Sequence, residues 1–201
     1  PNPAIEDGYL FRGPMDESEF LDYLIEKCAK NRITLTFSCQ KDSSYTGYFD
    51  HTERELVVWV GRSRKLWLPD LIHEMCHLDQ FLEDLPLFWK CGEYGLVEDE
   101  KHWERYDQTT LKKALNLYRD LEYDCEKRAV KFIRQNDFDI DLEFYCQNAN
   151  ACLYYYSLIT DGWKSSPANY PDLIAIMPTT LKPCKRVPPH IKKLFESYNL
   201  V

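Results

Sequence analysis

The stretch Leu71-Ile-His-Glu-Met-Cys-His-Leu-Asp-Gln-Phe81 contains the pattern H-E-x-x-H between His73 and His77. Residues four apart lie on one face of a helix, so both imidazoles can bind a single metal ion. Glu74 follows His73 directly, where its carboxylate can reach a metal-bound water instead of the metal. The pattern predicts a hydrolytic metal centre. The alternative is a core helix whose two histidines have only structural partners.

The residues around this pattern favour a helix. Pro69 fits the first turn of a helix, Asp70 complements the positive end of the helix dipole, and no helix breaker follows until Pro86. Apolar residues recur at a 4-3-4-3 spacing, which is typical of one buried stripe: Leu71, Met75, Leu78, Leu82 and Leu85. At about 100° per residue, the two histidines of the pattern fall on the side opposite this stripe.

Length and composition favour one folded domain over residues 1–201. With 201 residues, of which 44% are hydrophobic, the chain can bury a single core. We expect a core over residues 1–135 with an insertion at 83–108. We also expect a helical and proline-rich wrap over residues 136–201. No apolar run approaches the roughly 18–20 residues of a membrane span.

Charge and cysteine usage narrow the functional classes. A net charge of −8 argues against a general nucleic-acid surface or an anionic membrane as partner. The eight cysteines never form C-x-x-C, so a zinc ribbon or thioredoxin-type site is poorly supported. The N-terminus shows no secretion signal. We therefore expect mostly reduced thiols and a cytoplasmic protein.

The first part of the chain predicts an α+β arrangement. Residues 15–31 have a helical apolar face with Ser18 as a plausible cap. Strands are predicted at residues 32–39, 45–50 and 55–60, before the helix that carries the H-E-x-x-H pattern. A small mixed β-sheet packed on that helix is the expected core.

The C-terminal third predicts further helices and irregular chain. Residues 141–161 have a helical apolar face, and the run Tyr154-Tyr-Tyr156 could supply a hydroxyl donor to an oxyanion, although core tyrosines are commoner. From residue 165 onward, prolines predict a largely irregular wrap, followed by a short helix at 190–198.

A long helix at residues 110–135 is the second informative stretch. Its helical projection places Glu122 and Glu126 on the apolar stripe. Buried carboxylates are costly unless they are paired, protonated or bound to metal. One of them, together with the two histidines, would complete a His₂Glu zinc set with an open fourth position. The alternative is that both lie at the edge of the stripe and pair with Arg119 or Arg128.

The segments His73-Glu-Met-Cys-His77 and Glu122-Tyr-Asp-Cys-Glu126-Lys-Arg-Ala129 together resemble the gluzincin metallopeptidases, including the minimal ImmA/IrrE and HtpX types. The resemblance implies a zincin-like fold, with a glutamate-bearing helix beside the H-E-x-x-H helix and extra C-terminal helices. It further implies that His73, His77 and Glu122 bind Zn²⁺ and that Glu74 is the general base. Glu126 takes the place of the aspartate that orients the first histidine.

Three departures from the family pattern matter. A glutamate stands at 126 in place of aspartate, which leaves the alternative that Glu126 is the ligand and Glu122 its support. The spacing from His77 to Glu122 is longer than in thermolysin-like members. Nothing in this sequence spans a membrane, unlike the HtpX type. The resemblance extends over residues 55–135 and is specific only at its two motifs.

These observations predict a zinc metallopeptidase that hydrolyses a peptide or protein substrate through a metal-activated water. A substrate peptide is expected to add as a strand beside residues 55–60. Two alternatives stay open. One is a catalytically inactive zincin-fold protein that binds or regulates a partner and keeps a structural zinc. The other is a zinc hydrolase acting on something other than peptides.

Overall fold

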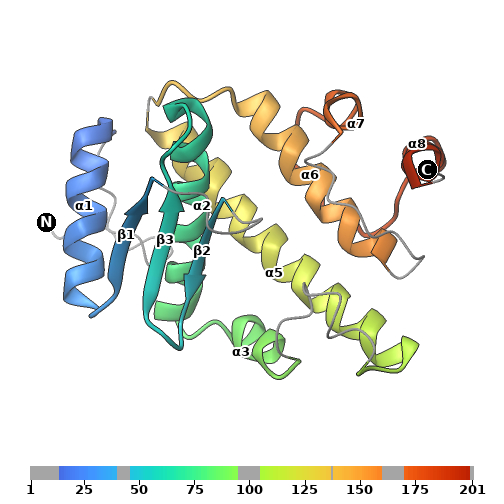
Figure 1. Cartoon of the computed structure of the whole chain (residues 1–201), viewed down its shortest axis with the longest axis horizontal. Helices are drawn as coiled ribbons and strands as arrows, with labels where there is room; N and C mark the ends of the chain where they lie inside the picture. Colours follow the sequence, from blue (N-terminus) through green and yellow to red (C-terminus); the bar gives the residue numbers. More distant parts are fainter. Residues whose placement is uncertain (1–13, 40–45, 95–104, 137, 160–169, 200–201) are drawn as a thin grey trace, which may run out of the picture. The chain divides into compact units, whose positions relative to one another are not determined.

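The computed structural model describes residues 14–39, 46–94, 105–136, 138–159 and 170–199 (Figure 1). The elements in chain order are α1 (Glu17–Lys30), β1 (Thr34–Ser38), β2 (Gly47–Asp50), β3 (Glu55–Trp59), α2 (Arg64–Leu82), α3 (Pro86–Gly92), α5 (Gln108–Gln135), α6 (Leu142–Ile159), α7 (Pro171–Ala175) and α8 (Pro189–Asn199). A small three-stranded sheet accompanied mostly by helices confirms the predicted α+β class.

The chain divides into two compact units. The first comprises residues 1–75 and 129–140, and the second comprises residues 76–128 and 141–201. Helices α2 and α5 each cross the boundary without a break in their helical structure. The H-E-x-x-H pattern lies on α2 at this boundary, so helical geometry alone fixes the spacing of its two histidines.

The sheet of the first unit has the strand order β1-β3-β2. Strand β1 runs parallel to β3, and β2 runs antiparallel to it, which makes the sheet mixed as predicted. Leu56 and Val58 are fully buried and alternate with half-buried neighbours. The expected addition of a peptide beside residues 55–60 is wrong, because β3 is the central strand and both of its edges are already hydrogen-bonded.

Helix α1 packs against β1 within the first unit. Its N-cap is Asp16, not the predicted Ser18: the Asp16 carboxylate accepts from the Glu19 amide while Glu19 completes a capping box. Phe20 is fully buried and its ring lies 5.3 Å from that of Phe132 in the last turns of α5. These contacts attach both helices to one core.

Helix α2 begins five residues before the predicted start, so Pro69 lies inside it. An ion pair between Arg62 and Asp70 joins the chain just before the helix to its second turn. The predicted stripe is buried at Leu71, Met75 and Leu78 and ends before Leu82, which is 37% exposed. Ile72 and Cys76 are also buried, so more of the helix circumference is covered than the stripe predicted.

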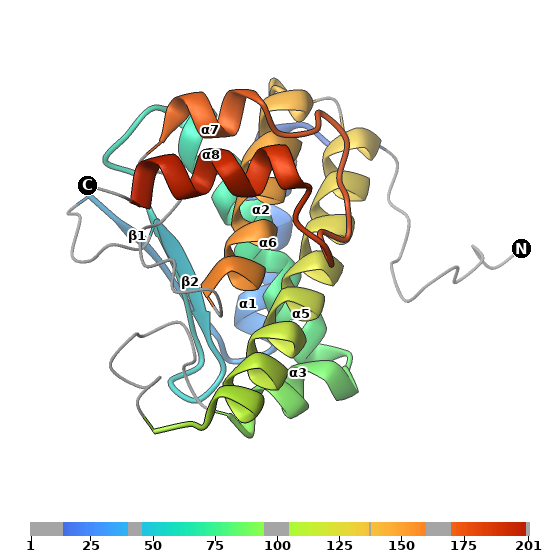
Figure 2. The same cartoon turned by 90° about the vertical axis from the view of Figure 1, so that its right-hand side faces the viewer.

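The second unit is helical (Figure 2). Helices α6, α7 and α8 share a core that includes Leu153, Leu173 and Phe195. The first half of α5 packs through Leu111 and Leu115 in a second cluster that includes Ile159 from the end of α6. The helices predicted at 110–135, 141–161 and 190–198 are thus present, with small shifts at their ends.

Two irregular predictions were partly wrong. The short helix α3 lies in the predicted insertion 83–108, and α7 lies in the wrap expected to be irregular. Each begins with proline at its first position, where the missing amide costs nothing. Residues 95–104 of the insertion lie outside the described part of the chain. All eight cysteines are free thiols, as expected.

None of the helices in the described ranges combines the length and apolarity that a membrane span requires.

Candidate metal centre

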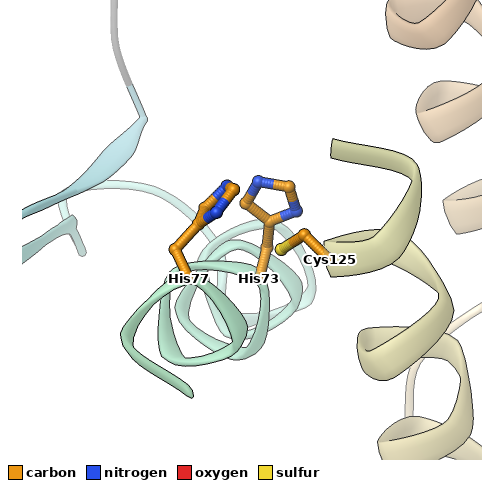
Figure 3. A group of neighbouring side chains, drawn as sticks. All are labelled: His73, His77 and Cys125. Carbon is orange, nitrogen blue, oxygen red and sulfur yellow. The ribbon is translucent and has the colours of Figure 1, made fainter. Parts of the chain in front are cut away.

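Helices α2 and α5 bring three potential metal ligands together. His73 and His77 lie one turn apart on α2, and Cys125 of α5 faces them (Figure 3). One ligand atom from each residue lies within 4.8 Å of the others. Cys125 is fully buried and both histidines are half-buried. The two histidines lie on one face of α2, as their spacing predicted. The third member differs from the prediction, because Cys125 was not among the predicted ligands and Glu122, which was, is not part of this group.

Gln80, one turn after His77 on α2, fixes how that histidine is held. The Gln80 side chain is fully buried, and its Nε2 donates to the Leu121 carbonyl at 3.0 Å and to Asp124 Oδ2 at 3.1 Å. Both partners are acceptors, so the amide orientation is determined. Gln80 Oε1 therefore accepts from Nδ1 of His77 at 2.9 Å, which leaves Nε2 of that ring for another partner.

Glu122 is the residue that faces Nε2 of His77. Its Oε1 lies 3.3 Å from His77 Nε2, and both side chains retain a little exposure, 17% and 13%. Two ligand atoms bound at about 2.0–2.1 Å to one tetrahedral ion lie about 3.3 Å apart. The pair therefore has the separation that a shared zinc ion would require. The competing interpretation is an ion pair with a protonated His77.

The arginines that could have neutralised the buried glutamates bind other carboxylates. Arg119 pairs with Asp120 at 3.0 Å. Arg128 donates to Asp124 at 2.7 Å and to Glu83 at 2.8 Å. These contacts remove the support for the alternative in which Glu122 and Glu126 are ordinary ion-pair partners of those two arginines.

Glu126 is buried, as its place on the apolar stripe predicted, with 8% of its surface exposed. The Tyr145 hydroxyl of α6 donates to Glu126 Oε2 at 2.5 Å. Burial raises the pKa of Tyr145 well above its usual value, and the Glu126 carboxylate raises it further. Tyr145 therefore remains a hydrogen-bond donor at neutral pH, which keeps the carboxylate oriented.

Cys125 lies beside a second buried thiol, that of Cys76 within the H-E-x-x-H pattern. Burial raises the pKa of Cys125 well above its usual value. A hydrogen bond with Cys76 and the nearby Glu122 and Glu126 carboxylates raise this pKa further. In the metal-free protein, Cys125 is thus a neutral thiol.

Glu74, the predicted general base, lies against the first residue of β2. It is 8% exposed, and a Cβ placed on Gly47 would lie 3.1 Å from its Cγ and 3.4 Å from its Oε1. The same Cβ would be 3.0 Å from the Val57 carbonyl oxygen. Glycine at position 47 therefore leaves the space that the Glu74 side chain occupies.

The structure places the tyrosines that were predicted as possible oxyanion donors in apolar clusters. Tyr154 is 5% exposed in the core shared by α6, α7 and α8, and burial beside Cys184 raises its pKa to about 12. Tyr155 and Tyr156 pack against the cluster around Leu115. Tyr145, assigned by periodicity only to the inner face of the helix, is the tyrosine that contacts a predicted site residue.

Three residues of this centre escaped sequence reasoning. Gln80 and Asp124 had no motif to mark them, and Asp124 was assigned to the solvent face although it accepts from Gln80, Arg128 and Lys127. Cys125 was counted as apolar. The available signal was local: Gln80 follows His77 by three residues on the same helix, where its side chain can reach the ring.

Comparison of the chain with protein-family models, curated proteins and solved structures found no match.

Proposed function

We propose that this protein is a zinc-dependent metallopeptidase with a zincin-like catalytic core, in which His73, His77 and Glu122 hold the metal. One observation carries the proposal: the 3.3 Å separation between Nε2 of His77 and Oε1 of Glu122, with Nδ1 of the histidine fixed by Gln80. A histidine nitrogen and a carboxylate oxygen at this separation are able to share one tetrahedral metal ion.

The donor set fits zinc. Two imidazoles and one carboxylate are a common catalytic zinc set, and they leave one coordination position for water. A bound zinc ion would lower the pKa of that water and polarise a substrate carbonyl. Gln80 holds the His77 tautomer, and Tyr145 holds the carboxylate of Glu126. Such supporting hydrogen bonds typically accompany metal ligands.

Glu74 is the residue assigned to proton transfer. As general base its carboxylate accepts a proton from the attacking water and later delivers that proton to the leaving amine. Its place supports this role, because Glu74 directly follows the first histidine on α2 and its side chain is shielded from solvent beside Gly47. The substrate class that fits these steps is a peptide or protein.

The position of Cys125 favours a second candidate, a non-catalytic protein with a structural zinc. If Cys125 joins the two histidines and Glu122, the protein supplies four ligands and no position stays open for water. Closed sites that include cysteine are typical of structural zinc. The two candidates therefore differ in whether the Cys125 sulfur binds the metal.

The first experiment measures metal content and cobalt absorption. We expect about one zinc per chain in the wild type, retention in Cys125→Ser and loss in Glu122→Ala. Glu126→Ala should retain the metal with weaker affinity, whereas its complete loss would make Glu126 the ligand. Cobalt-substituted protein should lack the intense thiolate-to-cobalt band, and a band abolished by Cys125→Ser would establish the structural alternative. Absence of bound metal after zinc is supplied would refute both candidates.

The second experiment tests catalysis. Glu74→Gln should keep its zinc and lose cleavage of an unfolded protein substrate by at least about 10²-fold, the usual contribution of a general base. Glu93→Gln, which makes the same change at an exposed glutamate outside the metal centre, is the matched control and should cleave at the wild-type rate. Turnover of small esters by wild type without cleavage of any protein would instead assign a zinc hydrolase of another class.

A further inference from the structure

A pocket of about 300 Å³ lies in the second unit, between the first half of α5, the end of α6 and the chain that leads into α8. Five cationic side chains line it: Lys112, Arg119, Lys185, Arg186 and Lys192. The described residues that line it include no carboxylate. This concentration of positive charge is notable in a chain whose net charge is −8.

Arg119 anchors the pocket from inside. It is 5% exposed, and its guanidinium donates to Asn116 at 2.6 Å, to Asp120 at 3.0 Å and to the Ser157 hydroxyl at 3.4 Å. Asp120 offsets one of the five positive charges. Neither Lys185 nor Arg186 forms an ion pair with any described carboxylate. Holding like charges together is unfavourable without an anion.

The segment that leads to Lys185 and Arg186 is held by hydrogen bonds from a buried side chain of α6. The Asn150 side chain is fully buried, and its amide donates to the Pro178 and Thr180 carbonyls at 2.8 and 3.0 Å. Its Oδ1 accepts from the Lys182 backbone amide at 2.8 Å. Both ends of the Asn150 side-chain amide therefore bind the segment 178–182. Such anchoring gives the cationic wall a defined position.

Backbone strain marks the same segment. Cys184 adopts φ 45°, a left-handed conformation that is uncommon for residues other than glycine. Its carbonyl accepts from Ser157 at 3.3 Å, and Ser157 in turn accepts from Arg119. Strain of this kind persists where surrounding contacts over-determine it, and it concentrates at functional sites. Here it places Lys185 and Arg186 beside the buried arginine.

We propose that this pocket binds a small oligophosphate, either free or as the polyphosphate tail of a nucleotide. Several excess positive charges favour a ligand with more than one negative charge, and guanidinium groups match phosphate geometry with paired hydrogen bonds. The pocket volume fits a small polyanion. A concave site on an acidic protein disfavours an extended nucleic acid. This site is separate from the proposed metal function and independent of it.

The test is calorimetric titration with sodium tripolyphosphate at fixed ionic strength. The double variant Lys185→Gln/Arg186→Gln should weaken binding about tenfold or more, because it removes two ligand-facing charges. The matched control is Lys182→Gln/Lys193→Gln, which removes the same charge from exposed residues outside the pocket and should bind as wild type does. Circular dichroism melts establish that both variants are folded.

Parallel titrations with adenosine triphosphate and adenosine identify the source of the phosphate. Tighter binding of the nucleotide than of tripolyphosphate assigns a nucleotide, and equal binding assigns free oligophosphate. The proposal is overturned by absence of saturable binding or by equal losses in both double variants. It is also overturned if a single-stranded oligonucleotide binds more tightly than tripolyphosphate through Lys185 and Arg186.

Discussion

Helix α5 carries two polar clusters, one around Glu122 and the other around Arg119, and they are built on opposite principles. Around Glu122, acceptors and donors alternate: Gln80 donates to Asp124 while it accepts from His77. Around Arg119, five cationic side chains gather, Asp120 pairs with one of them, and the described residues that line the pocket include no acidic one. The first arrangement favours a cation beside His77, and the second favours an anion beside Arg119.

The comparison shows that a residue's position along one helix does not determine whether its surroundings favour a cation or an anion. Arg119 and Glu122 are three residues apart, about one turn, yet their neighbours come from different elements. Gln80 of α2 supplies the partner on one side, and the segment before α8 supplies the cations on the other. The two clusters can therefore be disrupted separately.

The largest effect is expected from Asn150→Ala, which leaves two carbonyls and one amide of the segment 178–182 without their buried partner. We expect a loss of about 3 kcal/mol in the free energy of unfolding, measured by urea denaturation. Gln147→Ala, which loses two bonds from a half-buried side chain to the Ala175 and Met177 carbonyls, should cost less. If Asn150→Ala still binds zinc, the two clusters are independent of each other. If it loses zinc, the two clusters are coupled.

Gln80→Leu disrupts the other cluster by removing the acceptor that holds Nδ1 of His77. Zinc affinity should fall about 10–100-fold, the usual consequence of losing such a support, as measured by competition with a chelating dye. Tripolyphosphate affinity should not change. Gln147→Leu serves as control and should keep wild-type zinc affinity. An unchanged zinc affinity in Gln80→Leu would show that His77 needs no orienting partner.

Tyr145→Phe removes a single hydrogen bond to the buried carboxylate of Glu126. We expect a loss of about 1.5–3 kcal/mol in the free energy of unfolding, because the hydrogen bond involves a charged acceptor. Combining it with Glu126→Gln in a double-mutant cycle isolates the pairwise contribution. If the two losses add without coupling, the contact does not stabilise the folded protein.

Asp107→Ala tests the helix that carries both clusters and should produce the smallest effect. Hydrogen bonds from the Thr110 hydroxyl, the Thr110 amide and the Thr109 amide hold the pKa of Asp107 below its ordinary value. A carboxyl group whose pKa is lower in the folded state than in the unfolded state stabilises the folded protein at pH values above its unfolded-state pKa. This stabilisation is lost as the pH falls through the folded-state pKa. The wild type should therefore be more stable than the variant at pH 7, with a difference that shrinks below about pH 4. A constant difference would contradict this.

Periodicity and turn chemistry were sufficient to predict the type and approximate bounds of most helices and strands. Alternation predicted β1, and a preceding turn and β-rich composition predicted β2 and β3, all close to their observed bounds. A 3.6-residue period predicted α1, α5 and α6. Glu126, which the helical projection placed on the apolar side of α5, is buried, whereas Glu122 keeps some exposure. The start of α2 was not, because Pro69 is tolerated inside the helix, where it was expected only in the first turn.

The sequence by itself determined the local chemistry: two histidines one helical turn apart, a glutamate beside the first, and two glutamates on the inner face of α5. Only the tertiary structure decided which groups meet. It brings Gln80 to His77 and Tyr145 to Glu126, and it places β3 between the other two strands. The physical reason is range. Helical and strand periods are set by neighbouring residues, whereas hydrogen-bond partners depend on packing between segments that no local pattern encodes.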